Sequence, residues 1–377
     1  MNKNKKEIFL AIAILMSTII GAGIFGLPYA AAQSGFLVAF VFLFLLLGVM
    51  LLLHLFYVAI VEKTNKEYQL TGYINRYLGG GAKKIIGFFI IITFYGSLLV
   101  YMIIGGDFLH IFLSQFVSIS QTECSIILFI IGSIAIYFGL KIVSRWDLVI
   151  NLMLIVIVIA LFFWATQNID FNNVKTINWK GSAISYGAIL YSLLGIAAIP
   201  EVRRIFSNGN KSKYKKAVVI GTIIPAIIYL IFMFAIVGLA GEETTPDAVH
   251  VLGRYISGDI IVWGSLFGFL MILSSFLSLG MALKQTYVYD FNISRIKAWG
   301  LTCFVPLVLL LMGVSNFIVI IEIMGAMIGA FEGTAIILMY NKLIKPKAGI
   351  KIVGNMVILV LLSGFIYTLI SVIHTVK

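Results

Sequence analysis

Three glycines and a proline interrupt the first apolar segment of the chain, in the stretch STIIGAGIFGLPYAAAQSGF at residues 17–36. Gly21, Gly23, Gly26 and Pro28 lie where a membrane-spanning helix would otherwise keep all its backbone hydrogen bonds. Non-helical backbone at membrane depth is tolerated where it is buried in protein or lines a polar cavity. Its free N–H groups can bind a carboxylate, and Gly23 lets a ligand approach the backbone closely. The stretch therefore predicts a binding site inside the membrane.

A second interruption occurs in YSLLGIAAIPEVRRIF at residues 191–206, where Gly195 and Pro200 break another apolar segment. Gly21 follows Phe9 by 12 residues and Gly195 follows Ser182 by 13. At 1.5 Å per residue both lie roughly 18–20 Å deep, near the middle of a bilayer. Paired breaks in two halves of opposite orientation are typical of a transporter's central site. The alternative interpretation is a pair of ordinary kinks or small-residue packing seams.

A third candidate element is the stretch MILSSFLSLGMALKQTYVYDF at residues 271–291. Ser274 and Ser275 lie 14 and 15 residues after Ile260, which puts them at roughly 21–23 Å, a matching depth. With the backbone oxygen of Met271, their hydroxyls offer oxygen ligands to a small cation. The alternative is that these hydroxyls bond to carbonyls of the preceding turn, as is common in membrane helices.

The composition identifies the elements that carry these residues as membrane helices. Hydrophobic residues make up 61% of the chain, charged residues 11%, and the mean hydropathy is +1.09. A bilayer core of about 30 Å needs roughly 20 apolar residues per helix. We predict eleven spans, at about 8–33, 36–61, 85–116, 124–140, 146–167, 182–201, 217–240, 260–285, 298–313, 316–340 and 352–374. We expect one transmembrane core at 1–340, with repeats at about 8–167 and 182–340, and an additional helix at 341–377.

The net charge of +12 is distributed as a membrane orientation signal rather than as a nucleic-acid patch. With a cytoplasmic amino terminus, all but four of the 27 basic residues fall in inside-facing segments. The four exceptions are Lys175, Lys180, Arg254 and Lys377. An odd number of spans then places the carboxy terminus outside. An alternative interpretation of the opening as a cleaved signal peptide is disfavoured, because the apolar segment continues through residues 24–32 to spanning length.

Ionisable and aromatic residues within the spans are further candidates. Glu322, roughly 9 Å below the outer surface, is a candidate for proton coupling or an outer gate; the alternative is a protonated carboxyl bonded to a neighbouring helix. Tyr95 is a candidate for lining the substrate cavity, although aromatic packing explains it equally well. His54 reads as a packing or interhelical hydrogen-bonding residue. The sequence carries no metal-binding or catalytic pattern, and Cys124 has no metal or redox spacing to the only other cysteine.

Four stretches resemble one family of transporters. The stretch IIGAGIFGLPYAAAQSGF resembles the helix 1 signature of the amino acid/polyamine/organocation superfamily, most closely its amino acid/auxin permease and aromatic amino acid permease branches. LLGIAAIPEV resembles their helix 6 motif, VYMIIGGDFL their helix 3 and SSFLSLGMAL their helix 8. Gly195-Ile196 departs from the aromatic-histidine pair that aromatic permeases often carry. The similarity covers residues 1 to about 340.

The resemblance implies an all-α, leucine-transporter-like fold, with five helices and five inverted helices and with helices 1 and 6 broken. It implies that an amino acid binds between these two helices, its carboxylate at backbone N–H groups and its amine at carbonyls. The implied substrate residues are Ile19, Ile20, Gly21, Ala22, Gly23, Leu193, Leu194 and Gly195. The implied sodium-site residues are Ser17, Ile20, Met271, Ser274 and Ser275; related transporters with similar serines use protons instead.

The sequence therefore predicts a secondary active transporter of amino acids in the cell membrane, coupled to H⁺ or Na⁺ and working by alternating access. No cofactor, metal or obligate protein partner is expected, and the partners are the amino acid and the lipid bilayer. The alternative is a membrane receptor that senses an amino acid on the same scaffold without transporting it. An enzyme and a channel are both disfavoured, because neither catalytic motifs nor a pore-lining charged ring occur in the sequence.

Overall fold

The computed structural model describes residues 3–66, 68–139, 143–206, 211–256 and 258–376, which are helical and contain no strand. Lys141 and Lys377, used in the orientation argument, and residue 140 of one predicted span lie outside this part. The helices are α1 (Lys3–Ile19), α2 (Gly23–Ser34), α3 (Phe36–Lys63), α4 (Leu70–Leu78), α5 (Gly80–Leu113), α6 (Gln121–Phe138), α7 (Val143–Ala165), α8 (Ser182–Ser192), α9 (Ala198–Ile205), α10 (Lys211–Ala240), α11 (Val249–Leu252), α12 (Gly258–Gln285), α13 (Arg295–Leu311), α14 (Phe317–Met327), α15 (Thr334–Ile344) and α16 (Ala348–Val376).

The prediction of an all-helical membrane protein is confirmed, whereas the predicted count of eleven spans is not. Among the described residues, seven helices are long and apolar enough to cross a membrane, and the pair α1 and α2, bent by 56°, would make an eighth. One of the seven is α14 continued through the π-helical η5 (Ile328–Gly333) into α15. The predicted spans at 182–201 and 298–313 correspond to α8 with α9 and to α13, each of which has fewer than 18 residues. The predicted span at 146–167 corresponds to α7, which contains an apolar helical segment at Val149–Ala165.

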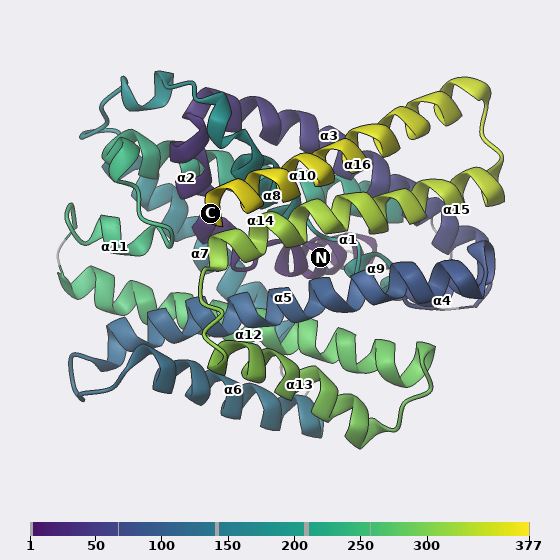
Figure 1. Cartoon of the computed structure of the whole chain (residues 1–377), viewed down its shortest axis with the longest axis horizontal. Helices are drawn as coiled ribbons and strands as arrows, with labels where there is room; N and C mark the ends of the chain where they lie inside the picture. Colours follow the sequence, from purple (N-terminus) through teal and green to yellow (C-terminus); the bar gives the residue numbers. More distant parts are fainter. Residues whose placement is uncertain (1–2, 67, 140–142, 207–210, 257, 377) are drawn as a thin grey trace.

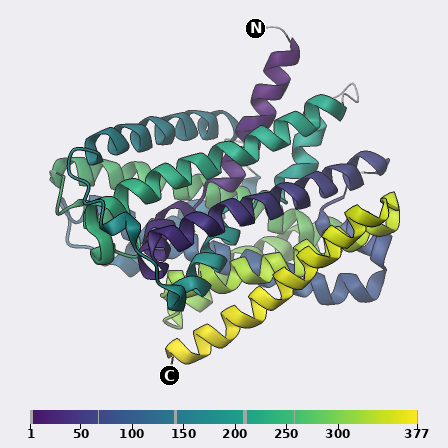
Figure 2. The ribbon, with the colours of Figure 1, turned by 90° about the horizontal axis from the view of Figure 1, so that it is seen from above.

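The long helices lie side by side in one bundle, with α16 along its periphery (Figure 1). Only 11% of the apolar window of α16 is buried within the protein, against 78% for the span from α14 to α15. Figure 2 shows the amino-terminal turns of α1 projecting from the bundle. The span from α14 to α15 is therefore an inner helix, and α16 presents most of its apolar surface outward.

Paired glycines bring α8 against α14 at the centre of the bundle. A Cβ added at Gly325 would overlap the backbone oxygen of Gly187, and one added at Gly187 would overlap the backbone of Glu322. Small residues at a crossing allow two membrane helices to approach at backbone distance. This crossing fixes α8, and the carboxy-terminal end of α8 at Ser192 leads directly into the second interruption.

Candidate functional site

The first interruption separates α1 from α2 at residues 20–22. The N–H groups of Gly21, Ala22 and Gly23 have no backbone partner among the described residues, and no side chain caps α2. Helical bonding resumes when Ile24 and Phe25 donate to the carbonyls of Gly21 and Ala22, at 3.3 and 3.1 Å. Free N–H groups at a helix amino terminus carry partial positive charge. The geometry suits a bound carboxylate, as the sequence predicted for these residues.

The second interruption, residues 193–197, separates α8 from α9. The N–H groups of Gly195, Ile196 and Ala197 have no backbone partner in the described part of the chain. A Cβ at Gly195 would lie 2.9 Å from Ile19 Cγ1 and 3.0 Å from His54 Cε1. Glycine is therefore required here because α1 and α3 approach the interruption closely. Pro200 lies in the first turn of α9, where its missing N–H costs no helical hydrogen bond.

The two interruptions touch each other. A Cβ at Gly23 would overlap the Ser192 hydroxyl and would lie 2.9 Å from Ser192 Cα. The first residue of α2 thus packs directly on the last residue of α8. Residues of the two predicted substrate stretches, 19–23 and 193–195, are brought together by this contact and by that of Ile19 with Gly195.

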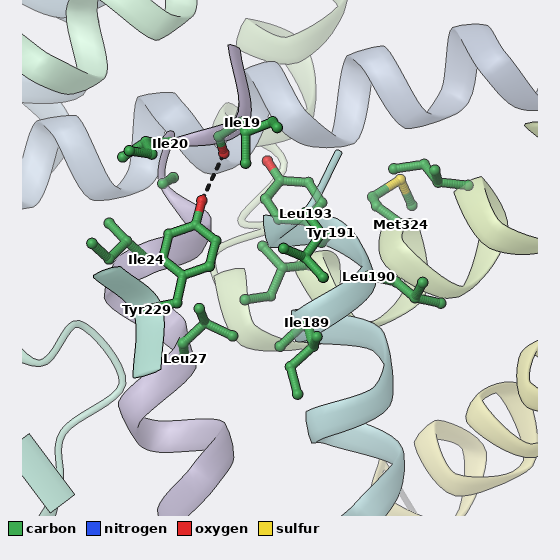
Figure 3. Packing of buried hydrophobic residues seen from close by; sticks show 14 of the residues in the cluster. Ile19, Ile20, Ile24, Leu27, Ile189, Leu190, Tyr191, Leu193, Tyr229 and Met324 are labelled. Carbon is green, nitrogen blue, oxygen red and sulfur yellow. Dashed lines mark hydrogen bonds between the residues drawn. The ribbon is translucent and has the colours of Figure 1, made fainter. Parts of the chain in front are cut away.

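Tyr229 on α10 connects the two helix ends through one hydroxyl group. Its Oη lies 2.8 Å from the Ile19 carbonyl and 2.9 Å from the Ser192 carbonyl, so its single proton is shared between the two oxygens. The side chain is fully buried. Figure 3 shows Tyr229 reaching the end of α1 at Ile19. The sequence analysis missed this residue, because a tyrosine in an apolar span gives no signal of which backbone groups it will meet.

Hydroxyl groups from α5 and α8 face the first interruption. A Cβ at Gly21 would lie 2.7 Å from the Tyr101 hydroxyl. The Tyr191 hydroxyl is buried without a hydrogen bond in the described structure, beside the side chains of Ser97 and Tyr101. The predicted cavity residue Tyr95 instead hydrogen-bonds to Tyr287, with a distance of 2.5 Å between the two hydroxyl oxygens.

A cavity of about 40 Å³ reaches the second interruption. Its walls include Thr93, Phe94 and Ser97 on α5, and Leu194 and Ile196 at the interruption. Glu332 on η5 also lines it and is buried, with a long hydrogen bond of 3.5 Å from the Thr93 hydroxyl. The cavity extends to residues 69–71 and to Thr286 at the end of α12. It combines apolar and hydroxyl-bearing walls.

The predicted cation residues lie on α1, on α12 and between α1 and α2. The Ser275 hydroxyl donates to the Met271 carbonyl at 3.1 Å, which is the bond to the preceding turn that the sequence analysis gave as the alternative. Ser17 is half-buried on α1, Ile20 is buried just after it, and Ser274 follows Leu273 on α12.

Glu322 lies on α14 beside the crossing with α8. It is only 4% exposed, and its Oε1 has no hydrogen-bond partner among the described residues. An unpaired carboxyl in such a place is costly as an anion. Glu322 is therefore a candidate for proton coupling or for an outer gate.

An ion-pair cluster joins the loop between α10 and α12 to the end of α5. His250 on α11 pairs with Asp247, and its Nδ1 lies 3.8 Å from the Asp107 carboxylate. Asp247 is buried and also accepts hydrogen bonds from the Thr245 hydroxyl and the His250 backbone. The hydrogen bond to Asp247 raises the pKa of His250 from 6.5 to about 8. The charge attraction between this loop and Asp107 on α5 is therefore present only while His250 is protonated.

We expect this loop to loosen as the pH rises through about 8. A raised histidine pKa stabilises the folded loop fully below about pH 6.5, and the contribution disappears above the folded pKa of about 8. Because the ring is 53% exposed, the effect is at most about 1 kcal/mol. Hydrogen exchange of residues 241–256, corrected for intrinsic rates, measures it. His250→Gln is expected to abolish the pH dependence and His374→Gln to preserve it; equal protection at pH 6 and 9 in the unmodified protein would contradict the assignment.

Comparison with known proteins places this geometry in a family. The sequence matches the tryptophan/tyrosine permease family over residues 4–374. It is 22% identical over 314 residues to Glutamine transporter 2 of Aliivibrio fischeri, covering 80% of each protein. It is 23% identical over 335 residues to Tyrosine-specific transport system 1 of Haemophilus influenzae, covering 83% of this chain and 82% of that protein.

The fold is shared with a solved structure, that of MhsT in complex with L-phenylalanine. The TM-score is 0.62 at 16% identity, over 95% of this chain and 98% of that one. At this identity the likeness concerns the fold alone, and it supports the leucine-transporter-like architecture expected from the sequence. Since the family match spans nearly the whole chain, the protein belongs to the tryptophan/tyrosine permease family and is a multi-pass amino acid permease, not an enzyme.

Proposed function

We propose that this permease carries neutral amino acids across the cell membrane by cation-coupled symport, with the substrate bound between the two interruptions. The observation that supports this most strongly is their direct contact at the centre of the bundle. One side offers free N–H groups at residues 21–23, and the other offers the carbonyls of Leu193 and Leu194, which accept no backbone hydrogen bond among the described residues. Free donors on one side and free acceptors on the other fit a ligand with both an anionic and a cationic group.

The substrate carboxylate would bind the N–H groups of Gly21, Ala22 and Gly23, with the Tyr101 hydroxyl facing Gly21 as a further donor. The substrate amine would bind carbonyls of Ile20, Leu193 and Leu194. Those of Ile19 and Ser192 already accept from Tyr229. The carbonyl of Gly195 accepts the Ala198 N–H at 3.1 Å and has a second lone pair to offer.

The mixed walls of the cavity support a neutral side chain as the transported class. Thr93 and Ser97 supply hydroxyls, while Phe94, Leu194 and Ile196 supply apolar surface. Glutamine and tyrosine, the substrates named for the two relatives, both combine an apolar stem with a polar end. We therefore extend the substrate class of the relatives to this chain as neutral amino acids.

We also propose that the chain crosses the membrane eleven times and that its core is an inverted repeat of five helices and five helices. The seven long apolar helices account for seven spans. The pair α1 and α2, the pair α8 and α9, and the single helices α7 and α13 would supply the other four of the eleven predicted spans. The repeats would cover about 8–167 and 182–340, followed by the additional helix at 341–377. The distribution of basic residues supports a cytoplasmic amino terminus and an external carboxy terminus.

The coupling ion is H⁺ or Na⁺ in this proposal, and no other cofactor or obligate protein partner is part of it. Ser17, Ile20, Met271, Ser274 and Ser275 would supply oxygen ligands to Na⁺. Glu322, buried without a partner for Oε1, would carry a proton or act at an outer gate.

Counterflow in proteoliposomes tests the function. Purified protein is reconstituted with one unlabelled amino acid inside, and uptake of labelled amino acid is measured across a panel of the neutral class. The series is repeated without sodium and with the pH gradient collapsed. Saturable counterflow of a neutral amino acid that accelerates with one ion gradient is expected, whereas binding without flux would reject transport.

A further inference from the structure

His54 on α3 is a fully buried histidine placed against the second interruption. It is 0% exposed, and its ring carbon Cε1 lies 3.0 Å from the position that a Cβ on Gly195 would occupy. The same Cβ position is 2.9 Å from Ile19 Cγ1, at the end of α1. The ring therefore lies where α1, α3 and the interruption between α8 and α9 meet.

The hydrogen-bond network favours one tautomer of this histidine. The Thr222 hydroxyl on α10 lies 2.8 Å from the Val218 carbonyl, to which it can donate its only proton. In that arrangement its oxygen, 2.9 Å from His54 Nδ1, accepts a hydrogen bond from the ring. Nδ1 then carries the ring proton, and Nε2 of the neutral ring is a bare acceptor. This Nε2 is buried with no hydrogen-bond partner in the described structure.

A buried nitrogen lone pair without a donor is an unsatisfied polar group. Two kinds of group could satisfy it: an N–H or O–H donor, or a proton that turns the ring into a cation with two N–H groups. Histidine is the side chain whose ordinary proton affinity suits physiological pH. Because its neighbours include the interruption at Gly195, a proton added at Nε2 would appear next to the proposed substrate site.

No charged side chain of the described residues contacts the ring. Of the elements packed against α3, α10 presents Thr222, and its Tyr229 donates to two carbonyls. Glu332 on the neighbouring η5 hydrogen-bonds to Thr93. The other titratable side chains on elements packed against α3 are Tyr29 on α2, Lys175 on η1 (Asn173–Lys175), Tyr186 and Tyr191 on α8, Glu201, Arg203 and Arg204 on α9, Lys211, Lys213, Tyr214, Lys215 and Lys216 on α10, and Tyr340 and Lys342 on α15. None forms an ion pair or hydrogen bond with His54.

We propose that Nε2 of His54 binds the coupling proton of this permease. The inference rests on the proposed function and selects H⁺ from its two coupling ions. In the empty carrier the neutral ring is bonded to Thr222 and leaves the centre of the membrane uncharged. When an amino acid binds, its carboxylate at residues 21–23 favours a positive charge at His54, and the proton in turn favours the carboxylate. Coupling of this kind is reciprocal by thermodynamic necessity.

The stoichiometry of this cycle is one proton with one zwitterionic amino acid. The loaded carrier then bears one positive charge, contributed by His54, and the returning carrier bears none at this site. With one proton per substrate, each pH unit across the membrane supports up to about a tenfold accumulation ratio. Transport should therefore be electrogenic and driven by an acidic exterior.

The test measures substrate uptake and proton entry together in proteoliposomes that enclose a pH-sensitive dye. The substrate is the amino acid with the strongest counterflow in the unmodified protein. His54→Gln, which keeps a neutral polar side chain, is expected to lose substrate-evoked proton entry and pH-driven accumulation. Its apparent KM should no longer change between pH 5.5 and 8. His374→Gln, at an exposed histidine near the end of α16, is the matched control and should retain both.

Nuclear magnetic resonance of the unmodified protein provides a second measurement that needs no variant at position 54. The chain has only four histidines, and ¹⁵N labelling with Gln variants of the other three assigns the resonances. His54 is expected to be neutral with the proton on Nδ1 when substrate is absent. It should become doubly protonated when substrate is added.

The outcomes separate this proposal from the proposed function. Counterflow without proton entry in the unmodified protein, driven by sodium alone, would overturn the role of His54 and leave amino acid transport intact. So would proton-driven accumulation that persists in His54→Gln, or a His54 resonance that stays neutral with substrate bound. Absence of counterflow for every amino acid would instead remove the proposed function itself.

Discussion

Replacing Gly23 by alanine is expected to lower the affinity for the transported amino acid by about 100-fold. The added Cβ would lie 2.9 Å from Ser192 Cα and would overlap the Ser192 hydroxyl. Because Ser192 Cα belongs to the backbone, the clash can be relieved only by separating α2 from α8. Overpacking of this kind costs about 1–3 kcal/mol, and about 3 kcal/mol corresponds to 100-fold in affinity. The methyl group also narrows the approach to the N–H groups that we assign to the carboxylate.

Equilibrium binding of labelled amino acid to the purified variant measures the loss. Gly48→Ala is the matched control, since a Cβ at Gly48 on α3 would meet no atom within 4 Å. The control should bind like the unmodified protein, and both variants should elute as folded protein in size-exclusion chromatography. Unchanged affinity in Gly23→Ala would show that the contact of the two interruptions does not form the substrate site.

The interruptions could be predicted because their cause is local. Gly21 and Gly23 remove side chains exactly where α1 gives way to α2, and Gly195 does so between α8 and α9. Pro200 was a less accurate marker, since it lies inside α9. Depth in the membrane followed from counting residues at a constant rise. The positions of the glycines, together with a constant rise per residue, therefore predicted both breaks from the sequence.

The partners of these breaks could not be predicted, because they depend on how helices rotate against one another. The apolar helices α3, α5 and α10 carry hydrophobic residues all round, so periodicity does not identify the inward face. Tyr95 was the tyrosine candidate in the sequence, yet it bonds to Tyr287, and it is Tyr101 that faces Gly21. The link between His54 and Thr222 joins residues 168 positions apart, which no motif reports.

The span count shows a different limit. An interruption shortens the helices on either side of it, so α8 has 11 residues and α9 has eight. A minimum helix length then excludes a span that is interrupted in this way. The apolar stretches of the sequence predicted which segments could cross the membrane. The structure shows at which residues the helices in those segments end.

Replacing Tyr229 by phenylalanine is expected to weaken substrate binding by about tenfold and to lower the melting temperature. The change keeps the ring but removes the hydroxyl that donates to the carbonyls of Ile19 and Ser192, for which the described residues offer no other donor. Both residues are buried in the core of the bundle. A buried polar group left without a partner costs about 1–3 kcal/mol, and a tenfold loss of affinity corresponds to about 1.4 kcal/mol. Without this hydroxyl, α10 no longer fixes the positions of the ends of α1 and α8 relative to each other.

Ligand binding and thermal unfolding of the detergent-solubilised protein measure the two effects. Tyr340→Phe is the control, because the Tyr340 ring stacks on Phe56 at 3.8 Å between centroids and keeps that contact without its hydroxyl. It should change neither quantity. If Tyr229→Phe lowered the melting temperature but left the affinity unchanged, Tyr229 would stabilise the bundle without positioning the site. A joint loss means that the group connecting the helix ends also sets the geometry in which the amino acid binds.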